Sequence, residues 1–249
     1  MLTRVKTEQE IIAMRNAGKI LASVLSTLKH SVKPGMTTKD LALIAKSELK
    51  GTGGIPSFLG YQGFPDVLCV SVNEEVVHGI PGDRKINDGD IVSMDFGVTY
   101  DDMICDAAIS VVVGNISNPK HARLVRDTEA ALSKGINVLK NGCRVGDIAS
   151  AIESSIGKQY GIVRDLVGHG VGHQLHEEPN IPNYGSPGTG MKLLSGMTIA
   201  IEPMVTMGSH KVHTDIDGWT VKTVDDSLAA HFEHTVLITD NGSEILTAL

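Results

Sequence analysis

The segment "VKPGMTTKDLALIA" (residues 32–45) returns in altered form 107 residues later, as "LKNGCRVGDIASAI" (residues 139–152). At this offset a lysine, a glycine, an aspartate and an alanine recur, in the pairs Lys33/Lys140, Gly35/Gly142, Asp40/Asp147 and Ala42/Ala149. Self-similarity at a fixed spacing is typical of a duplicated structural unit. The sequence therefore predicts two related halves.

Further matches extend the repeat to acidic residues. The same offset aligns "DGDIVSMDF" with "SGMTIAIEP", so that Asp95 corresponds to Glu202. An offset of 127 aligns "DAAISVV" with "EHTVLIT", so that Asp106 corresponds to Glu233. The added residues of the second half include "DGWTVKT", which predicts a turn and an extra strand. Two acidic residues of each half thus occupy corresponding places.

Capping signals and apolar periodicity predict two pairs of helices, each pair followed by strands. The first helix has a capping box of Thr7 and Glu10, and the third has Asn118 as its cap and Pro119 in its first turn. The predicted helices cover residues 7–30, 38–50, 118–140 and 146–160, and the clearest strands cover 67–72, 90–98 and 107–114. This order predicts an α+β fold with pseudo-twofold symmetry. We expect one catalytic domain over residues 1–249, with halves of about 1–115 and 116–249 and a site where they meet.

The composition narrows the class of protein. The chain has 249 residues, 41% of them hydrophobic, which is enough for a substantial core. With 29 acidic and 22 basic residues, it is a poor candidate for binding nucleic acid or an anionic membrane. Three widely spaced cysteines, no apolar run near the ~20 residues of a membrane span, and no readable signal peptide predict a cytoplasmic protein.

Asp95 and Asp106 flank a predicted turn at Asp101-Asp102. In a simple hairpin they would lie opposite one another on adjacent strands. Two carboxylates on a half-buried strand face repel each other unless a cation lies between them. Taken alone, this pair would fit solvent-facing side chains equally well. Because the repeat adds Glu202 and Glu233, convergence of four acids on one or two cations explains the pattern better.

The stretch "DLVGHGVGHQLHEEP" (165–179) supplies histidines in a glycine-rich setting. His169 and His173 are four residues apart, a zinc-binding spacing on a helix, but the interleaved glycines make a helix improbable. Extended backbone next to glycines suits a close approach to a ligand. One imidazole beside four carboxylates favours Mn²⁺, Fe²⁺ or Co²⁺ over a thiolate-type zinc site. Two such ions could activate a water, which predicts a hydrolase.

Five motifs follow one another along the chain: "NEEVVHGIP" (73–81), "DFGVTYDDMICDAAIS" (95–110), "GHGVGHQLHEEP" (168–179), "IEPMV" (201–205) and "EHTVLITDNGSEILT" (233–247). In this order they resemble the motifs of the type I methionine aminopeptidases, a family of dinuclear metallopeptidases with the pita-bread fold. The resemblance covers essentially the whole chain. It implies a pseudo-twofold fold in which helices cover an antiparallel sheet.

The resemblance also implies a metal site. Its ligands would be Asp95, Asp106, His169, Glu202 and Glu233, holding two divalent ions from among Co, Mn, Fe, Zn and Ni. Asp106 and Glu233 would bridge the ions and Asp95 would chelate one of them. His169 and Glu202 would complete the other site, so the two sites would be chemically unequal.

Catalytic and substrate-binding residues follow from the same resemblance. His78 and His176 would contact the substrate, and Glu202 would also transfer protons. The methionine pocket would be lined by Tyr61, Phe64, Cys69, Leu175 and Trp219, with Phe58 nearby. Gln62 and Leu175 stand where some relatives carry histidine and phenylalanine. His231, two residues before Glu233, is a candidate for contacting the ligands, and His30, His121, His210 and His213 are expected to have no role.

The implied function is removal of the initiator methionine from nascent polypeptides with a small second residue. The chain would act as a monomer near the ribosome, without binding nucleic acid or membrane. Two alternatives remain: a proline-directed peptidase of the same fold, which usually carries an extra N-terminal domain, and a non-catalytic binding scaffold. Scaffolds of this fold typically lack a ligand, whereas all five are present here.

Overall fold

The computed structural model describes residues 3–115 and 118–248. Its helices are α1 (Glu8–Ser31), α2 (Thr38–Glu48), the 3₁₀ turn η1 (Tyr61–Gly63), α3 (Pro119–Asn137) and α4 (Val145–Ile156). The strands of the first half are β1 (Ile55–Pro56), β2 (Cys69–Val72), β3 (Glu75–Val77), β4 (Ile91–Tyr100) and β5 (Met103–Val112). Those of the second half are β6 (Gly161–Ile162), β7 (Gly168–Gly170), β8 (Glu177–Ile181), β9 (Thr198–Ile201), β10 (Met204–Thr206), β11 (Val212–Thr214), β12 (Val221–Thr223), β13 (Ala229–His231), β14 (Glu233–Ile238) and β15 (Ser243–Ile245).

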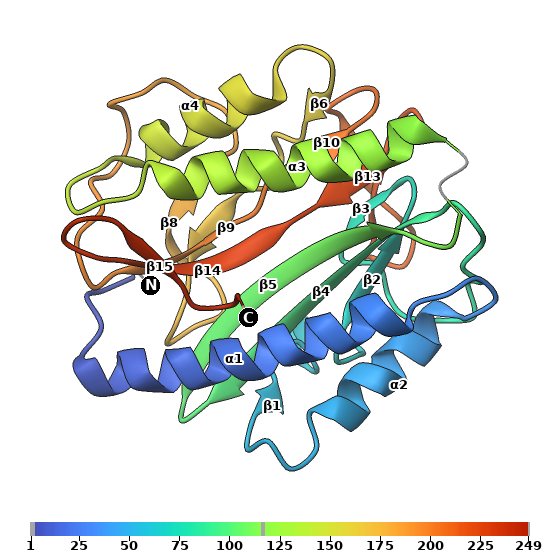
Figure 1. Ribbon diagram of the computed structural model, residues 1–249, viewed down its shortest axis with the longest axis horizontal. Helices are drawn as coiled ribbons and strands as arrows, with labels where there is room; N and C mark the ends of the chain where they lie inside the picture. Colours follow the sequence, from blue (N-terminus) through green and yellow to red (C-terminus); the bar gives the residue numbers. More distant parts are fainter. Residues whose placement is uncertain (1–2, 116–117, 249) are drawn as a thin grey trace.

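A nine-stranded antiparallel sheet joins the two halves of the chain. Its main order is β1-β4-β5-β14-β9-β7-β8, with β2 paired to β4 and β15 to β14. Figure 1 shows α1 and α2 beside the strands of the first half and α3 and α4 beside those of the second. Two small sheets, β13-β10-β6 and β11-β12-β3, complete the fold. Because β5 pairs directly with β14, the halves meet inside the sheet.

Backbone pairings outside the strands reproduce the 107-residue repeat. The isolated bridge Thr37↔Lys85 returns as Arg144↔Lys192. The hydrogen bond from Gly35 N to Ile86 O, 2.8 Å long, returns between Gly142 N and Leu193 O at the same length. The predicted duplication is therefore confirmed in the hydrogen-bond pattern. A boundary at residues 115 and 116, and the one-domain interpretation, stay predictions.

The predicted helix caps match the structure, but two predicted helix ends lie too late, since α3 ends at Asn137, three residues before its predicted end, and α4 also ends early. Thr7 and Glu10 form the expected capping box on α1, and the Asn118 side chain accepts a hydrogen bond from Lys120 N. Helix α4 ends at Ile156, four residues before the predicted end, because Gly157 turns the chain at φ 68°. A positive φ is available to glycine at little cost, so the helix stops there.

Helix α1 corrects the expectation that no segment suits a membrane span. Among the described residues it is the one helix long and apolar enough to cross a membrane by length and composition. Its apolar face, which includes Met14, Leu21 and Leu28, is fully buried against the sheet. The core helix of a water-soluble domain passes the same test, so this finding is weak evidence for a membrane span.

Alternation along β4 and β5 gives the sheet one apolar and one acidic face. Phe96 on β4 and Cys105 on β5 belong to the core beneath α1, where the Cys105 thiol donates to Met14 O over 3.2 Å. Successive side chains of a strand point to opposite faces. Asp95 and Asp106 therefore lie on the face away from α1.

Candidate metal centre and substrate pocket

Five neighbouring strands of the large sheet carry the five predicted metal ligands. Asp95 lies in β4, Asp106 in β5 and His169 in β7, while Glu233 opens β14 and Glu202 directly follows β9. These strands are adjacent in the order β4-β5-β14-β9-β7. Residues far apart in the sequence thus converge on one patch of the sheet.

The strand register places the acids differently from a simple hairpin. The turn lies at Asp101 and Asp102, both at positive φ, as predicted. It is centred between Tyr100 and Met103, so Asp95 pairs with Ala108 rather than with Asp106. The predicted direct pairing was wrong by two residues, a shift that keeps both side chains on one face.

Small Ala108 leaves room for the acids around it. Ala108 also pairs with Glu233, so one row across three strands runs Asp95, Ala108, Glu233. Asp106 is diagonal to this row, two residues along β5, and diagonal neighbours on one face remain within reach of each other's side chains.

All four carboxyl groups are held in surroundings that oppose their ionisation. Burial raises the pKa of Asp95 to about 7 and the pKa of Glu202 to about 8. Burial, and then the charge of a neighbouring acid, raises the pKa of Asp106 and of Glu233 well above the usual range. Among the described residues, no lysine or arginine lies within 4.0 Å to offset these charges.

Unsatisfied polar atoms indicate that the cluster fits a cation. Asp95 Oδ1, Asp106 Oδ1 and Glu233 Oε1 are buried without a hydrogen-bond partner in the part of the chain that the structure describes. Ligand atoms of Asp106, His169 and Glu233 all lie within 4.8 Å of one another. Burial lowers the pKa of His169 to about 3, so its imidazole is neutral and able to ligate. Its Nδ1 lies 2.9 Å from Gly170 O, which leaves Nε2 free.

The glycines around His169 lie against the backbone of neighbouring segments, and their predicted close approach to a ligand stays a prediction. A Cβ on Gly168 would lie 2.4 Å from Ala200 O, and one on Gly170 would lie 2.7 Å from Glu178 O. Both contacts are with backbone of neighbouring segments. The glycines therefore allow the strands that flank β7 to approach closely, and this holds His169 in the sheet.

A cavity of about 300 Å³ opens next to the acids and contains every predicted substrate residue. Its walls include Phe58, Tyr61, Phe64, Cys69, His78, Leu175, His176 and Trp219, together with all five predicted metal ligands. Val77, Asp165, Leu166 and Val167 also line it and were not predicted. The last three directly precede the GHG motif, so their position before a ligand strand was a signal that could have been used.

The apolar part of the cavity is a compact cluster. Phe58, Phe64, Cys69 and Leu175 are buried together, and Trp219 packs edge-on against Phe64 with ring centroids 5.2 Å apart. The four carboxylates line the same cavity, and Cys69 of the apolar cluster pairs directly with Asp95. The cavity thus places an apolar pocket directly beside a candidate metal centre.

A hydrogen-bond chain determines which nitrogen of His176 faces the cavity. Gln62 Nε2 donates to the Tyr61 hydroxyl over 3.2 Å, and that hydroxyl lies 2.8 Å from His176 Nδ1. Because the Tyr61 oxygen accepts from Gln62, its own proton is available to His176 Nδ1. In the tautomer in which Nδ1 accepts that proton, His176 carries its own proton on Nε2 and can donate it to a substrate oxygen. Its ring stands 4.3 Å from that of His169, centroid to centroid.

His78 also lines the cavity, in an unusual backbone conformation. Its φ is 59°, and its ring meets Trp219 edge-on at 6.5 Å. Burial, followed by the proximity of His231 and His176, lowers the pKa of His78 to about 4. A neutral imidazole here can donate or accept a hydrogen bond without adding charge to the site.

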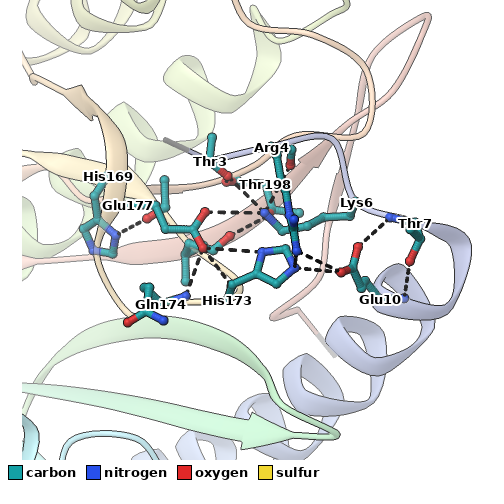
Figure 2. A network of polar contacts seen from close by, with 12 residues as sticks. Thr3, Arg4, Lys6, Thr7, Glu10, His169, His173, Gln174, Glu177 and Thr198 are labelled. Carbon is teal, nitrogen blue, oxygen red and sulfur yellow. Dashed lines mark hydrogen bonds and ion pairs between the residues drawn. The ribbon is translucent and has the colours of Figure 1, made fainter. Parts of the chain in front are cut away.

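The N-terminal segment supports the loop that carries His176. Figure 2 shows Lys6 extending from this segment to Glu177, the residue after His176. The Lys6 ammonium donates to Thr3 Oγ1 over 3.1 Å and lies 3.5 Å from Glu177 Oε2, and both charged side chains are fully buried. Glu177 Oε1 accepts hydrogen bonds from the backbone N–H groups of His173 and Gln174. His173 therefore belongs to this network.

Replacing Lys6 by methionine is expected to lower the free energy of unfolding by about 3 kcal/mol, because the Glu177 charge would remain buried without its partner. Urea denaturation would measure the change. The exposed Lys29→Met is the matched control, and the double variant Lys6→Met/Glu177→Gln should recover more than half of the loss. Equal stability of the Lys6 and Lys29 variants would contradict this assignment.

Comparison with known proteins places the chain in a family. The model of metallopeptidase family M24 matches residues 12–240. A methionine aminopeptidase of Clostridium perfringens is 49% identical over 245 residues, 98% of each chain. The crystal structure of the methionine aminopeptidase from Thermotoga maritima superimposes with a TM-score of 0.97 at 46% identity, covering 100% of both chains. The prolidase from Pyrococcus furiosus gives 0.78 at 24% identity, with 98% of this chain covering 65% of that one.

The helix-covered antiparallel sheet and the acid cluster on its open face define a metallopeptidase, and the chain belongs to metallopeptidase family M24. The predicted α+β pita-bread fold is confirmed. Within the family, the high identity over nearly the whole length is to methionine aminopeptidases. The similarity to prolidase, at under 25% identity, extends to the fold alone.

Proposed function

We propose that the chain removes the N-terminal methionine from nascent proteins and peptides whose second residue is small, using the residues that line the cavity. Its methionine aminopeptidase activity follows from homology with the curated methionine aminopeptidases. The observation that carries the assignment of the site is the cavity that joins five candidate ligands to an apolar pocket. The residue roles below are our proposal.

The apolar cluster suits a methionine side chain. Phe64, Leu175 and Trp219 provide an aliphatic and aromatic lining, and aromatic edges interact favourably with thioether sulfur. Cys69 adds a small, polarisable wall, and burial raises the pKa of its thiol so that it stays neutral. Such a lining favours an unbranched apolar side chain over a charged one.

The metal ligands would hold two divalent cations. Asp106 and Glu233 would bridge them, Asp95 would bind one, and His169 with Glu202 would bind the other. When bound, such ions lower the pKa of water and polarise a carbonyl oxygen. The oxygen-rich donor set suits Mn²⁺, Fe²⁺ or Co²⁺, with Zn²⁺ and Ni²⁺ as further candidates.

The protein's own side chains would orient the substrate and move the proton. His176 Nε2–H points its donor at the scissile carbonyl and stabilises the negative charge that develops there. His78 contacts the amide nitrogen or the next carbonyl. Glu202 takes a proton from the attacking water and returns it to the departing amine.

Two other functions fit the fold less well. A proline-directed peptidase is disfavoured because the prolidase match has 24% identity, against 46% for the methionine aminopeptidase from Thermotoga maritima. A binding scaffold is disfavoured because all five candidate ligands line the cavity, and three buried carboxylate oxygens among the described residues lack partners. Both alternatives predict no methionine release.

Methionine release from Met-Ala-Ser and Met-Lys-Ser tests the proposal. We expect the alanine peptide to be cleaved with at least a 100-fold higher kcat/KM, because the histidines that flank the metal centre narrow the cleft beside the scissile bond. A chelator should abolish cleavage, and Mn²⁺ or Co²⁺ should restore it. Free methionine measured by chromatography gives both rates. Equal cleavage of the two peptides would refute the small-neighbour preference, and no cleavage after metal addition would refute the function.

We further infer that the chain works as a monomer in the cytoplasm, on nascent chains near the ribosome. All three cysteines are unpaired and buried, as expected in a reducing compartment. The excess of acidic residues argues against direct binding to ribosomal RNA. Contact with nascent chains would therefore go through the polypeptide substrate itself.

A further inference from the structure

His231 is a buried histidine whose ring has no hydrogen-bond partner. It ends strand β13, and its backbone is fixed by the Ser110 hydroxyl, which bonds to both its N–H and its C=O at 2.8 Å. Its exposed fraction is 1%, and neither Nδ1 nor Nε2 is hydrogen-bonded within residues 3–115 and 118–248. An unsatisfied buried polar group costs about 1–3 kcal/mol. We therefore expect the imidazole of His231 to bind a group outside the protein chain through one of its ring nitrogens.

The ring lies beside two candidate ligands of the metal centre, near oxygens other than those that His169 approaches. His231 Nε2 lies 3.6 Å from Glu202 Oε2 and 4.0 Å from Glu233 Oε2. His169 Nε2 lies 3.5 Å from Glu202 Oε1 and 4.0 Å from Glu233 Oε1. Each glutamate thus presents one oxygen to one histidine and its other oxygen to the other.

These separations exceed a hydrogen bond and match donors that share a cation. Nitrogen–oxygen hydrogen bonds are normally about 2.7–3.2 Å long. Two atoms that each ligate one ion at about 2.1 Å lie roughly 3–4 Å apart, depending on the angle between them. The donor atoms of Glu202, His231 and Glu233 lie within 4.8 Å of one another, as do those of Asp106, His169 and Glu233. The centre therefore has two overlapping donor triads.

We infer that His231 is a sixth ligand residue of the metal centre, binding a divalent cation through Nε2. This inference deepens the proposed function and rests on its metal centre. The family resemblance implies two chemically unequal metal sites, with an imidazole at one of them. With His231 as a ligand, each of the two ions would receive one imidazole. Imidazole donors favour Fe²⁺, Co²⁺, Ni²⁺ or Zn²⁺ over Mg²⁺ and Ca²⁺.

Co²⁺ binding tests the inference without relying on activity. Chelator-treated protein is titrated with CoCl₂ by calorimetry, and the loaded protein is examined by proton NMR for hyperfine-shifted, exchangeable imidazole N–H signals. The wild type should show two such signals. His231→Gln should show one and should bind one of the two ions at least tenfold more weakly.

Two matched variants separate this role from a structural one. His169→Gln should remove the other shifted signal, and His234→Gln should keep both. His234 is half-buried, and its ring bonds to Thr247 Oγ1 on the opposite face of β14. A wild-type spectrum with the His169 signal alone, or unchanged Co²⁺ affinity in His231→Gln, would overturn the inference. The wild-type spectrum decides the matter even if a variant does not fold.

Failure of the metal centre itself would look different. Wild-type protein that binds no Co²⁺ and releases no methionine from Met-Ala-Ser would overturn both the proposed function and the role of His231. An active wild type that binds two ions, with only His169 giving a shifted signal, would overturn the role of His231 and leave the proposed function intact.

Discussion

Replacing Glu202 by glutamine is expected to lower kcat/KM for Met-Ala-Ser by about 10³-fold or more. General acid–base catalysis typically contributes about 10²–10⁴-fold to the rate. Burial raises the pKa of this carboxyl to about 8, and it lies 3.5 Å from His169 Nε2. A nearby cation would bring the pKa down towards neutrality, where a carboxylate can both take and return a proton. The amide of glutamine keeps the shape and one ligating oxygen but cannot carry a proton.

Metal content must be measured together with the rate, because Glu202 is also a candidate ligand. The variant is assayed at saturating Co²⁺, and bound metal is determined by equilibrium dialysis. Glu178→Gln is the matched control, since Glu178 lies near the site in the exposed part of β8. A Glu202 variant within tenfold of the wild-type rate would remove the residue's assigned role as proton carrier.

The sequence predicted those features that depend on local signals or on the repeat. The capping box of α1 and the Asp101-Asp102 turn are local, because each involves residues within one turn of chain. Two fixed sequence offsets were enough to show that Asp95 corresponds to Glu202 in the repeat and Asp106 to Glu233. Convergence of these acids on one patch then follows from the symmetry of the fold.

Features that depend on tertiary contacts were missed or wrongly placed. The register of β4 and β5 could not be deduced from the midpoint of two aspartates, because the centre of the turn lies one residue later. The role of Lys6 was missed because its partner, Glu177, is 171 residues away. The close contact of Gly168 with the neighbouring strand at Ala200 was also missed, because the sequence does not show which strands are adjacent.

Chelated protein is expected to lose stability as the pH rises from about 5 to 8, by about 6 kcal/mol from Asp95 and Glu202 together. Burial raises the pKa of Asp95 to about 7 and that of Glu202 to about 8 in the folded chain, above the values near 4 of an unfolded chain. Between these limits the folded state binds more protons than the unfolded state. Its stability is therefore complete at low pH and is lost as the pH passes the folded-state values.

Bound cations should reverse this dependence, because they replace the protons that the buried acids otherwise need. Ligation requires ionised carboxylates, so the stabilisation by Mn²⁺ should increase with pH. The midpoint of thermal unfolding, recorded from pH 5 to 8 with chelator and with Mn²⁺, should show two curves that diverge towards high pH. A chelated midpoint that stays flat or rises over this range would contradict the prediction.

Asp106→Asn separates the electrostatic cause from any general effect of pH. Burial and the charge of Asp95 raise the pKa of Asp106, so its ionisation also destabilises the chelated fold. A neutral amide at this position should make the chelated variant more stable than the chelated wild type at pH 8. The same variant should gain less from Mn²⁺, because a proposed bridging ligand is lost. One substitution would then stabilise the metal-free protein and weaken the metal-bound one, which is expected only if buried acids in the fold are held there for a cation.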